Sequence, residues 1–192
     1  HESDKAPANE QRIYRVLHLE GDLNYYQPLR FFTNWSRQHR ENLAVFAATL
    51  RQFEPDLIFV WGMWALSQAL PALAERLLPG RVVYYLSDYW PSAVDMHTAY
   101  WQSPARHWLM RPVRRGLGSL AMATLARAAP PDLQFEHAAC VSARVRELLV
   151  EAGVPVQHAR VIYGGTAVER FLGAAERDFA SPSLRLLYAG QL

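Results

Sequence analysis

A carboxylate between aromatic rings is the most chemically suggestive feature of this sequence. Asp88 stands in the stretch SDYWP, with Tyr89 and Trp90 directly after it and the apolar run 81–86 before it. A carboxylate at the end of a buried strand, beside rings that exclude water, could accept hydrogen bonds from the hydroxyls of a ligand or take a proton from one. Alternatively, Asp88 caps the turn that follows, as aspartate often does in loops that contain proline.

A second aromatic group follows another apolar run. Trp61, Met63 and Trp64 lie where residues 57–61 end as an expected strand. In open α/β sheets ligands bind beyond the carboxyl ends of the strands, so both groups belong to the expected binding edge. Indole rings supply a flat apolar surface and an N–H donor. The sequence leaves open whether these rings form a floor for a ligand or pack beneath the next helix.

A strand, a helix and a second strand follow one another in the last third of the chain. Residues 137–141 form an apolar run, and Ser142 provides a side-chain oxygen at the N-cap position of a helix. Gly153 is placed to end this helix, and residues 160–163 return as a strand before a turn at glycines 164 and 165. Two strands joined by such a helix form a parallel, right-handed unit.

The other apolar runs predict more elements of the same kind. We expect strands at residues 13–19, 57–61 and 81–86, and helices at residues 35–53 and 65–78. His18 would then be a core or half-buried residue of the first strand. This alternation predicts the α/β class, with a Rossmann-like parallel sheet and helices on both of its faces.

Length and composition limit the classes of function. The chain has 192 residues, of which 51% are hydrophobic, enough for the core of one domain. A net charge of +2 gives no global support for nucleic-acid binding. The single cysteine, Cys140, lies in an apolar run, which fits a core position and a reducing compartment. No apolar run approaches the roughly 20 residues of a membrane span, and no signal peptide opens the sequence.

Local charge is uneven in the segment 100–127. No acidic residue occurs between Met96 and Pro131, and Arg111, Arg114 and Arg115 are interleaved with aromatic and apolar residues. Such a segment could lie on an anionic membrane surface, with its aromatic side chains at the interface. The alternative is a solvated helix whose arginines pair with acids elsewhere in the fold.

Several of these motifs together resemble a known family. The order strand, Ser, helix and GVP, followed by VIY, a glycine turn, VERF and LRLLYAGQL, is similar to the retaining glycosyltransferases of the GT-B fold, the "group 1" family. PDLIFVWG and SDYWP resemble two further motifs of that family, with Ser87 in the place of its histidine. Gly164, Ala167 and Gln191 also differ from the residues that are usual there.

The resemblance implies an acceptor-side domain. Residues 1–182 would form the amino-terminal, Rossmann-like half of a GT-B fold, without its first strand and glycine loop. Residues 183–192 would form the first strand of an absent donor-binding domain. Asp88 would be the catalytic residue. The other implied site residues are Ser87, Tyr89, Trp90, Trp61, Trp64 and Ser142 for the acceptor, and Gly164, Gly165 and Gly190 for the hinge and donor side.

The implied reaction is the transfer of a hexose from a nucleotide-sugar donor to a hydroxyl of a sugar or lipid-linked sugar acceptor. Neither a metal nor another cofactor nor nucleic acid is expected. The donor would bind to the absent domain, so this chain alone is expected to be inactive. We expect a cytoplasmic protein, with peripheral contact at the inner membrane surface through Arg111, Arg114 and Arg115.

Two alternatives stay open. One is a sugar-nucleotide epimerase of the same fold, which would use Asp88 as an acid or base on the sugar ring. It would form product from a nucleotide sugar without any acceptor. The other is a non-catalytic module that binds lipid or a partner through the basic segment.

Overall fold

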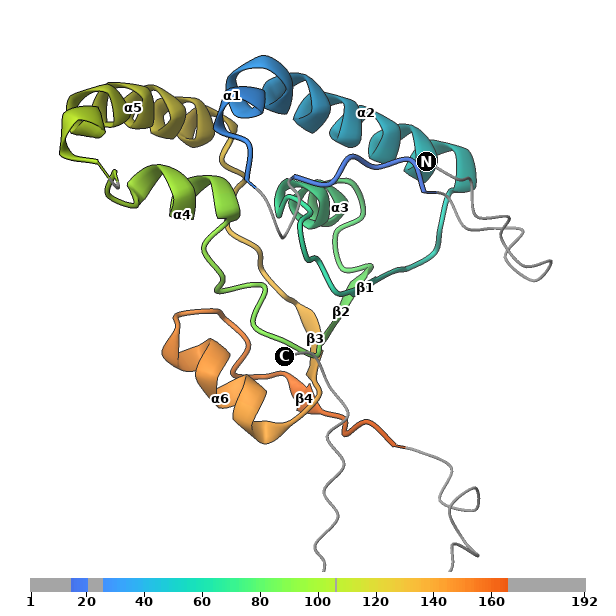
Figure 1. Ribbon diagram of the computed structural model, residues 1–192. Coiled ribbons are helices and arrows are strands. Elements are labelled where there is room, and N and C mark those ends of the chain that lie inside the picture. The colour runs from blue at the N-terminus through green and yellow to red at the C-terminus, as the bar shows by residue number, and fades with distance from the viewer. Residues whose placement is uncertain (1–14, 21–25, 106, 166–192) are drawn as a thin grey trace, which may run out of the picture.

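A parallel four-stranded sheet lies at the centre of the molecule (Figure 1). The computed structural model describes residues 15–20, 26–105 and 107–165. The strands, which lie side by side in chain order, are β1 (Ile58–Trp61), β2 (Val82–Leu86), β3 (His137–Cys140) and β4 (Arg160–Val161). Each neighbouring pair is parallel. The predicted α/β class is confirmed, and the two aromatic groups follow the carboxyl ends of adjacent strands.

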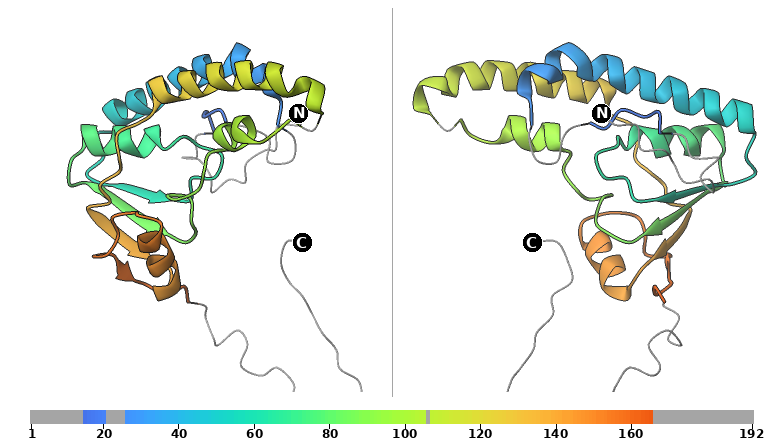
Figure 2. Two further views of the ribbon diagram at one scale, coloured as in Figure 1. Left: turned by 90° about the vertical axis from the view of Figure 1, so that its left-hand side faces the viewer. Right: turned by 45° about the vertical axis from the view of Figure 1, so that its right-hand side comes forward.

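Helices of very different length connect and cover the strands. They are α1 (Pro28–Arg30), the π-helical turn η1 (Phe31–Trp35), α2 (Ser36–Phe53), α3 (Ala69–Leu77), α4 (Met96–Gln102), the 3-10 turn η2 (Trp108–Met110), α5 (Arg111–Ala128) and α6 (Ala143–Glu151). In both views of Figure 2, the long helices α2 and α5 lie beyond α3 at one end of the described part of the molecule. Helix α6 lies at the opposite end. The helix predicted at 65–78 begins only at Ala69 and ends at Leu77, and Ala65 in the turn before it has a left-handed φ of 55°.

The unit of β3, α6 and β4 forms as the sequence predicts. The Ser142 hydroxyl accepts a hydrogen bond from the Val145 backbone N–H at 3.1 Å and so caps α6. After the helix, Gly153 has a φ of 84°, which favours glycine. β4 is shorter than predicted, although the Ile162 N–H still donates to the Cys140 carbonyl at 2.9 Å. The main chain therefore stays beside β3 slightly beyond β4.

One hydrophobic core joins the sheet to α3 and α6. Tyr84 and Leu149 are completely buried in it, and so is Cys140. Burial raises the pKa of the Cys140 thiol, so the predicted core position of this cysteine is confirmed. Glu75 ties α3 to the chain before β3, because its carboxylate accepts hydrogen bonds from the Tyr84 hydroxyl at 2.9 Å and from the Phe135 N–H at 3.1 Å.

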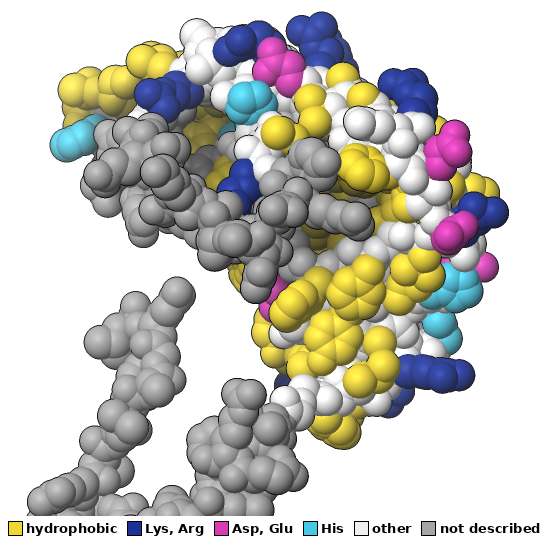
Figure 3. Space-filling model, turned by 90° about the vertical axis from the view of Figure 1, so that its right-hand side faces the viewer, with side chains coloured by type: hydrophobic (Ala, Val, Ile, Leu, Met, Phe, Trp, Pro, Cys, Tyr) yellow, Lys and Arg dark blue, Asp and Glu magenta, His cyan; other side chains and the backbone are white. Residues whose placement is uncertain are grey.

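The other face of the sheet is open over β1 in the described part of the chain. Side chains alternate along a strand, so Phe59 and Trp61 point away from the core, and they are 57% and 67% exposed. Figure 3, viewed from the side of Figure 1 on which β1 lies, shows hydrophobic side chains exposed there. The apolar run 57–61 predicts a strand buried on both faces, and the sequence predicts helices on both faces of the sheet. Among the described residues, β1 is instead an edge strand, and α3 and α6 share one core on the opposite face.

The strand predicted at residues 13–19 is not part of the sheet where the structure describes it, from residue 15 onward. The side-chain amide of Asn42 takes the place of a neighbouring strand. Its Oδ1 accepts from the His18 N–H at 2.8 Å, and its Nδ2 donates to the His18 carbonyl at 2.7 Å. The His18 side chain lies outside the core, which leaves the half-buried alternative of the prediction. It is 46% exposed and lies 3.1 Å from the Glu41 carboxylate.

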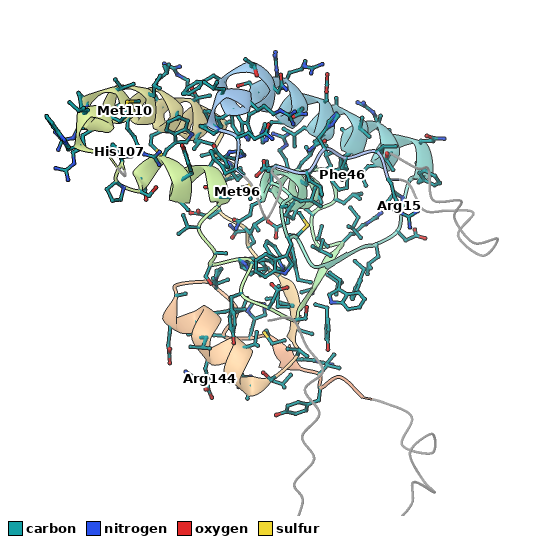
Figure 4. The ribbon with its side chains drawn as sticks, viewed as in Figure 1. Arg15, Phe46, Met96, His107, Met110 and Arg144 are labelled. Atoms are coloured by element: carbon teal, nitrogen blue, oxygen red, sulfur yellow. The ribbon has the colours of Figure 1, made fainter. Side chains whose placement is uncertain are left out.

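Helices α4 and α5 form a hairpin that projects from the sheet. Its inner side holds a small second core of Phe31, Trp35, Trp101 and Ala121. Arg114 fastens the two helices, because its guanidinium donates to the backbone carbonyls of Tyr100 and Ser103 and lies 4.1 Å from the centre of the Tyr100 ring. Figure 4 labels His107 and Met110 at the end of the hairpin farthest from α6. None of the described helices combines the length and apolar character that a membrane crossing needs.

Candidate functional site

A cavity of about 510 Å³ lies at the carboxyl edge of β1 and β2. The loops after these two strands, the turn η1 and the second half of α5 form its wall. Most of the wall is apolar or aromatic, with side chains that include Trp35, Trp64, Trp90, Met122 and Leu125. Glu20, Gln68 and Asp95 add polar groups. A mainly apolar cavity with a few polar groups is typical of a ligand site.

Asp88 lies behind the wall of this cavity. Its Oδ2 accepts a hydrogen bond from the Trp64 indole Nε1 at 2.9 Å, and its Oδ1 accepts one from the Trp90 backbone N–H at 2.9 Å. Both tryptophans belong to the wall, although the Trp90 ring also packs into the main core and is only 4% exposed. Asp88 therefore caps the turn, the alternative that the sequence left open, and at the same time holds two residues of the cavity.

Two further predicted site residues, Trp61 and Ser87, lie on the other side of the strand ends. The Trp61 Nε1 donates to the Ser87 Oγ at 3.2 Å, and the Trp61 ring meets the Tyr85 ring edge-on at 6.4 Å between centroids. Trp61 and Tyr85 are register partners on the open face of the sheet. The structure thus separates the predicted aromatic residues into a group at the cavity and a group on the open face.

The other predicted site residues lie outside the cavity wall. Tyr89 is 45% exposed, and Ser142 is engaged as the cap of α6. Gly164 and Gly165 follow β4 without a left-handed φ, and an added side chain at either position would meet no atom of the described residues within 4 Å. The backbone at these two positions therefore does not require glycine. Gly190 and the strand predicted at 183–192 lie outside the described residues.

Glu20, which lines the cavity, forms a buried polar pair with His39. The Glu20 Oε1 lies 3.7 Å from the His39 Nδ1, and the two side chains are 13% and 9% exposed. The Glu20 backbone N–H donates to the Ala65 carbonyl at 2.7 Å and so anchors segment 15–20 beside the end of β1. The only sequence signal for Glu20 is its place at the end of an expected strand. Among the residues that the structure describes, no group of three or more His, Cys, Asp or Glu side chains is arranged to hold a metal ion.

A smaller and more polar cavity of about 220 Å³ shares Glu20 and Trp35 with the first. His97 and Tyr26 also line it, and the Tyr26 hydroxyl lies 2.9 Å from the His97 Nδ1. Burial lowers the pKa of His97, although the nearby carboxylates of Glu20 and Asp95 oppose this effect. Burial also raises the pKa of Tyr26 to about 12. A neutral imidazole and a neutral phenol therefore face this cavity at pH 7.

The predicted basic residues divide into two kinds. Arg111 and Arg115 are exposed on α5, beside Trp108, which is 71% exposed. Arg114 instead faces α4 and is held there by carbonyl groups and the Tyr100 ring. In the described part of the chain, no ion pair joins these three arginines to an acid. The described residues therefore do not form the alternative, a helix whose arginines pair with acids.

Comparison with protein families identifies a match over most of the chain. The family model described as Glycosyltransferase Family 4 matches residues 2–170. This range includes all of the described residues and so the walls of both cavities. No curated protein and no solved structure matches the chain.

Proposed function

Because the chain belongs to glycosyltransferase family 4, we propose that it forms the acceptor-binding side of a retaining enzyme. The enzyme would transfer a hexose from a nucleotide sugar to an acceptor hydroxyl. The observation that carries this proposal is the cavity of about 510 Å³ at the carboxyl edge of β1 and β2. Ligands of open α/β sheets bind at this edge, and the indole of Trp64, which is 58% exposed, offers a flat surface on which a sugar ring can pack.

In this proposal Glu20 and Asp88 have different roles. Glu20 lines the cavity, so its carboxylate can accept a hydrogen bond from an acceptor hydroxyl directly. Asp88 acts mainly through Trp64, whose indole N–H it holds at 2.9 Å. Each Asp88 oxygen already accepts one protein N–H but keeps a lone pair for a further bond. Asp88 is therefore a positioning residue that an acceptor at the rim could also contact.

We assign the donor to a second domain. Its first strand would lie at residues 183–192, which are outside the described residues, and Gly164, Gly165 and Gly190 would belong to the hinge and donor side. No metal or other cofactor is part of this proposal.

The acceptor that we propose is a sugar linked to a lipid. Met122 and Leu125 of α5 belong to the cavity wall, and Trp108 is exposed directly before the other end of the same helix. Arg111 and Arg115 lie beside it and could contact anionic lipid headgroups. One helix would therefore reach from a membrane surface to the cavity, and the apolar part of the wall would suit the first part of a lipid chain.

Sugar transfer by the whole enzyme tests this function. A panel of nucleotide-sugar donors would be combined with free or lipid-linked sugar acceptors, and kcat/KM would be measured for the wild type and for Glu20→Gln and Asp88→Asn. Loss of a group that holds the acceptor is expected to lower kcat/KM by about tenfold or more. The matched control is Asp56→Asn, because Asp56 is exposed before β1, at the opposite edge of the sheet.

The outcomes separate the alternatives. Transfer that needs an acceptor and falls in both variants, but not in the control, supports the proposal. Conversion of the donor without an acceptor would indicate an epimerase. Full transfer by Glu20→Gln and Asp88→Asn would place the acceptor elsewhere.

A further inference from the structure

Four polar residues in the wall of the larger cavity, of about 510 Å³, come from the starts of two helices. Ser67 and Gln68 directly precede α3, and Asp95 and Thr98 lie at the start of α4, beside Met96, which Figure 4 labels. Among the described residues, no Arg, Lys or His side chain lines this cavity. The polar part of its wall therefore offers oxygen atoms without a cation.

The amide of Gln68 is oriented by two backbone carbonyl groups. Its Nε2 donates to the Trp90 carbonyl at 3.2 Å and to the Pro91 carbonyl at 3.3 Å. Because carbonyl oxygens only accept hydrogen bonds, the amide nitrogen faces them and the Oε1 faces away. The Oε1 has no partner among the described residues, and it is not buried, since the buried unpaired side-chain atoms there are all ring nitrogens. Gln68 thus keeps an acceptor open for a ligand in the cavity that it lines.

Asp95 presents a second open acceptor. Its Oδ1 caps α4 by accepting hydrogen bonds from the backbone N–H groups of His97 at 3.0 Å and Thr98 at 2.9 Å. These bonds hold the carboxylate in one orientation, and no described residue forms a hydrogen bond or an ion pair with the Oδ2. The side chain is exposed although it lines the cavity, so a ligand can reach the Oδ2.

These groups select a ligand by its hydrogen bonding and its charge. Amide and carboxylate oxygens accept hydrogen bonds and cannot donate them, so they suit the hydroxyl groups of a sugar ring. A carboxylate or phosphate on the ring would instead meet the like charge of Asp95, without a cation in the wall to offset it. The exposed indole of Trp64 in the same wall suits the apolar face of the ring.

We propose that Gln68 and Asp95 determine the acceptor specificity of the larger cavity. Each accepts a hydrogen bond from a hydroxyl of the acceptor ring, and Asp95 excludes a ring that carries a carboxylate or a phosphate. This inference rests on the proposed function, because it takes the larger cavity as the acceptor site. It narrows the substrate class to hydroxylated rings without an anionic group.

Matched pairs of sugars test the exclusion in the absence of donor. A methyl hexoside and the corresponding methyl hexuronide differ only at carbon 6, where the first has a neutral hydroxymethyl group and the second a carboxylate. Pairs with the configurations of glucose, galactose and mannose would be titrated into the wild-type protein, with affinity measured by NMR. We expect the neutral member of at least one pair to bind about fivefold more tightly or better, because two carboxylates a few Å apart near a protein surface repel each other to about this extent.

A variant of Asp95 assigns the exclusion to its charge. Asp95→Asn retains a side-chain oxygen that caps α4 but removes the charge, so it should reduce the affinity ratio of the pair to about half or less. Asp56→Asn is the matched control, because Asp56 is exposed before β1, and it should leave the ratio unchanged. An unchanged ratio in Asp95→Asn would overturn the role of this residue.

Monodeoxy versions of the best-binding hexoside test Gln68. For the wild type, removal of the hydroxyl that donates to the Oε1 should weaken binding by about three- to tenfold. Gln68→Met lacks this acceptor, so it should bind that deoxy sugar and its parent equally well. If Gln68 only supported the loops, the variant would bind both sugars more weakly and keep the ratio between them.

The remaining outcomes separate this inference from the proposed function. Equal wild-type affinities within every pair, or no binding of any neutral hexoside, would overturn the inference without recourse to a variant. In the whole enzyme, sugar transfer to a hexuronide as fast as to its neutral partner would also overturn it and would leave the proposed function standing. Selective binding of the neutral sugars without any transfer would support the specificity of the cavity and count against the proposed function alone.

Discussion

Trp64 and Asp88 follow different strands, yet the Trp64 indole N–H is fixed on the Asp88 Oδ2 at 2.9 Å. The second oxygen of the same carboxylate accepts the backbone N–H of Trp90. The loops after β1 and β2 are therefore coupled through one side chain, and the orientation of a large part of the cavity wall depends on it.

A double-mutant cycle measures this coupling. Trp64→Phe removes the indole donor, and Asp88→Asn removes the charge that strengthens both hydrogen bonds. We expect the effects on the free energy of unfolding to be less than additive, with a coupling energy of about 0.5–1.5 kcal/mol in urea titrations of the four proteins. Strictly additive effects would mean that the bond contributes nothing to the wall.

The position of Asp88 and Trp64 could be predicted because the signal is local. Each lies just after an apolar run, and the ends of adjacent parallel strands meet at one edge of a sheet. What local sequence cannot give is the direction of each side chain beyond the strand end. Trp61 and Ser87 consequently turned out to lie on the open face, and Asp88 behind the cavity wall instead of in it.

Residues that act over long sequence distances were missed for the same reason. Asn42 pairs with the backbone of His18, which is 24 positions away, and no pattern within α2 marks an asparagine for this duty. Segment 15–20 has the apolar pattern of a strand, but its backbone at His18 pairs with the Asn42 side chain and not with a strand of the sheet. His97 likewise becomes notable only when Tyr26 and Glu20 are brought beside it by the fold.

Asn42 is therefore expected to matter for stability. Asn42→Leu removes both hydrogen bonds to His18, and Asn42 is only 3% exposed, so we expect the free energy of unfolding to fall by about 1–3 kcal/mol. The measurement is urea unfolding monitored by circular dichroism. Gln52→Leu, at an exposed position of the same helix, is the control and should change stability by less than about 0.5 kcal/mol. Equal effects of the two substitutions would contradict this role of Asn42.

His97 gives stability a dependence on pH with a definite sign. Its folded-state pKa lies below the unfolded value, which is about 6.5, because burial disfavours the charged ring. The unfolded chain therefore binds the proton first. The contribution of His97 is fully present above pH 6.5 and is lost as the pH falls from there toward the folded pKa.

Urea unfolding of the wild type and His97→Gln at pH 7.5 and 5.5 tests this sign. The variant has no group to titrate, so it should lose less stability than the wild type between the two pH values. His137→Gln removes an exposed histidine and should keep the wild-type difference. A larger loss in His97→Gln than in the wild type would show that the buried ring is stabilised by protonation.

The three arginines of the α4–α5 hairpin are expected to contribute unequally to membrane binding. Arg111 and Arg115 are exposed, whereas Arg114 is held against the Tyr100 ring and cannot reach a bilayer without opening the hairpin. Each exposed arginine near an anionic surface contributes about 1 kcal/mol to binding. Arg111→Glu combined with Arg115→Glu should therefore weaken binding to anionic vesicles by more than about tenfold in sedimentation at about 0.1 M salt. Arg114→Glu should instead loosen the packing of α4 on α5, which a loss of thermal stability would report.

The control for net charge is Arg51→Glu combined with Arg81→Glu. Both residues are exposed, at the end of α2 and just before β2, and the pair changes the charge of the protein by the same amount. If the surface beside Trp108 is the contact, this control should retain most of the binding, because surface charges far from the bilayer are screened over about 10 Å. Equal losses in the two double variants would indicate attraction by overall charge alone. No sedimentation of the wild type with anionic vesicles would exclude a membrane contact through the hairpin, and the lipid-linked acceptor would lose its main structural support.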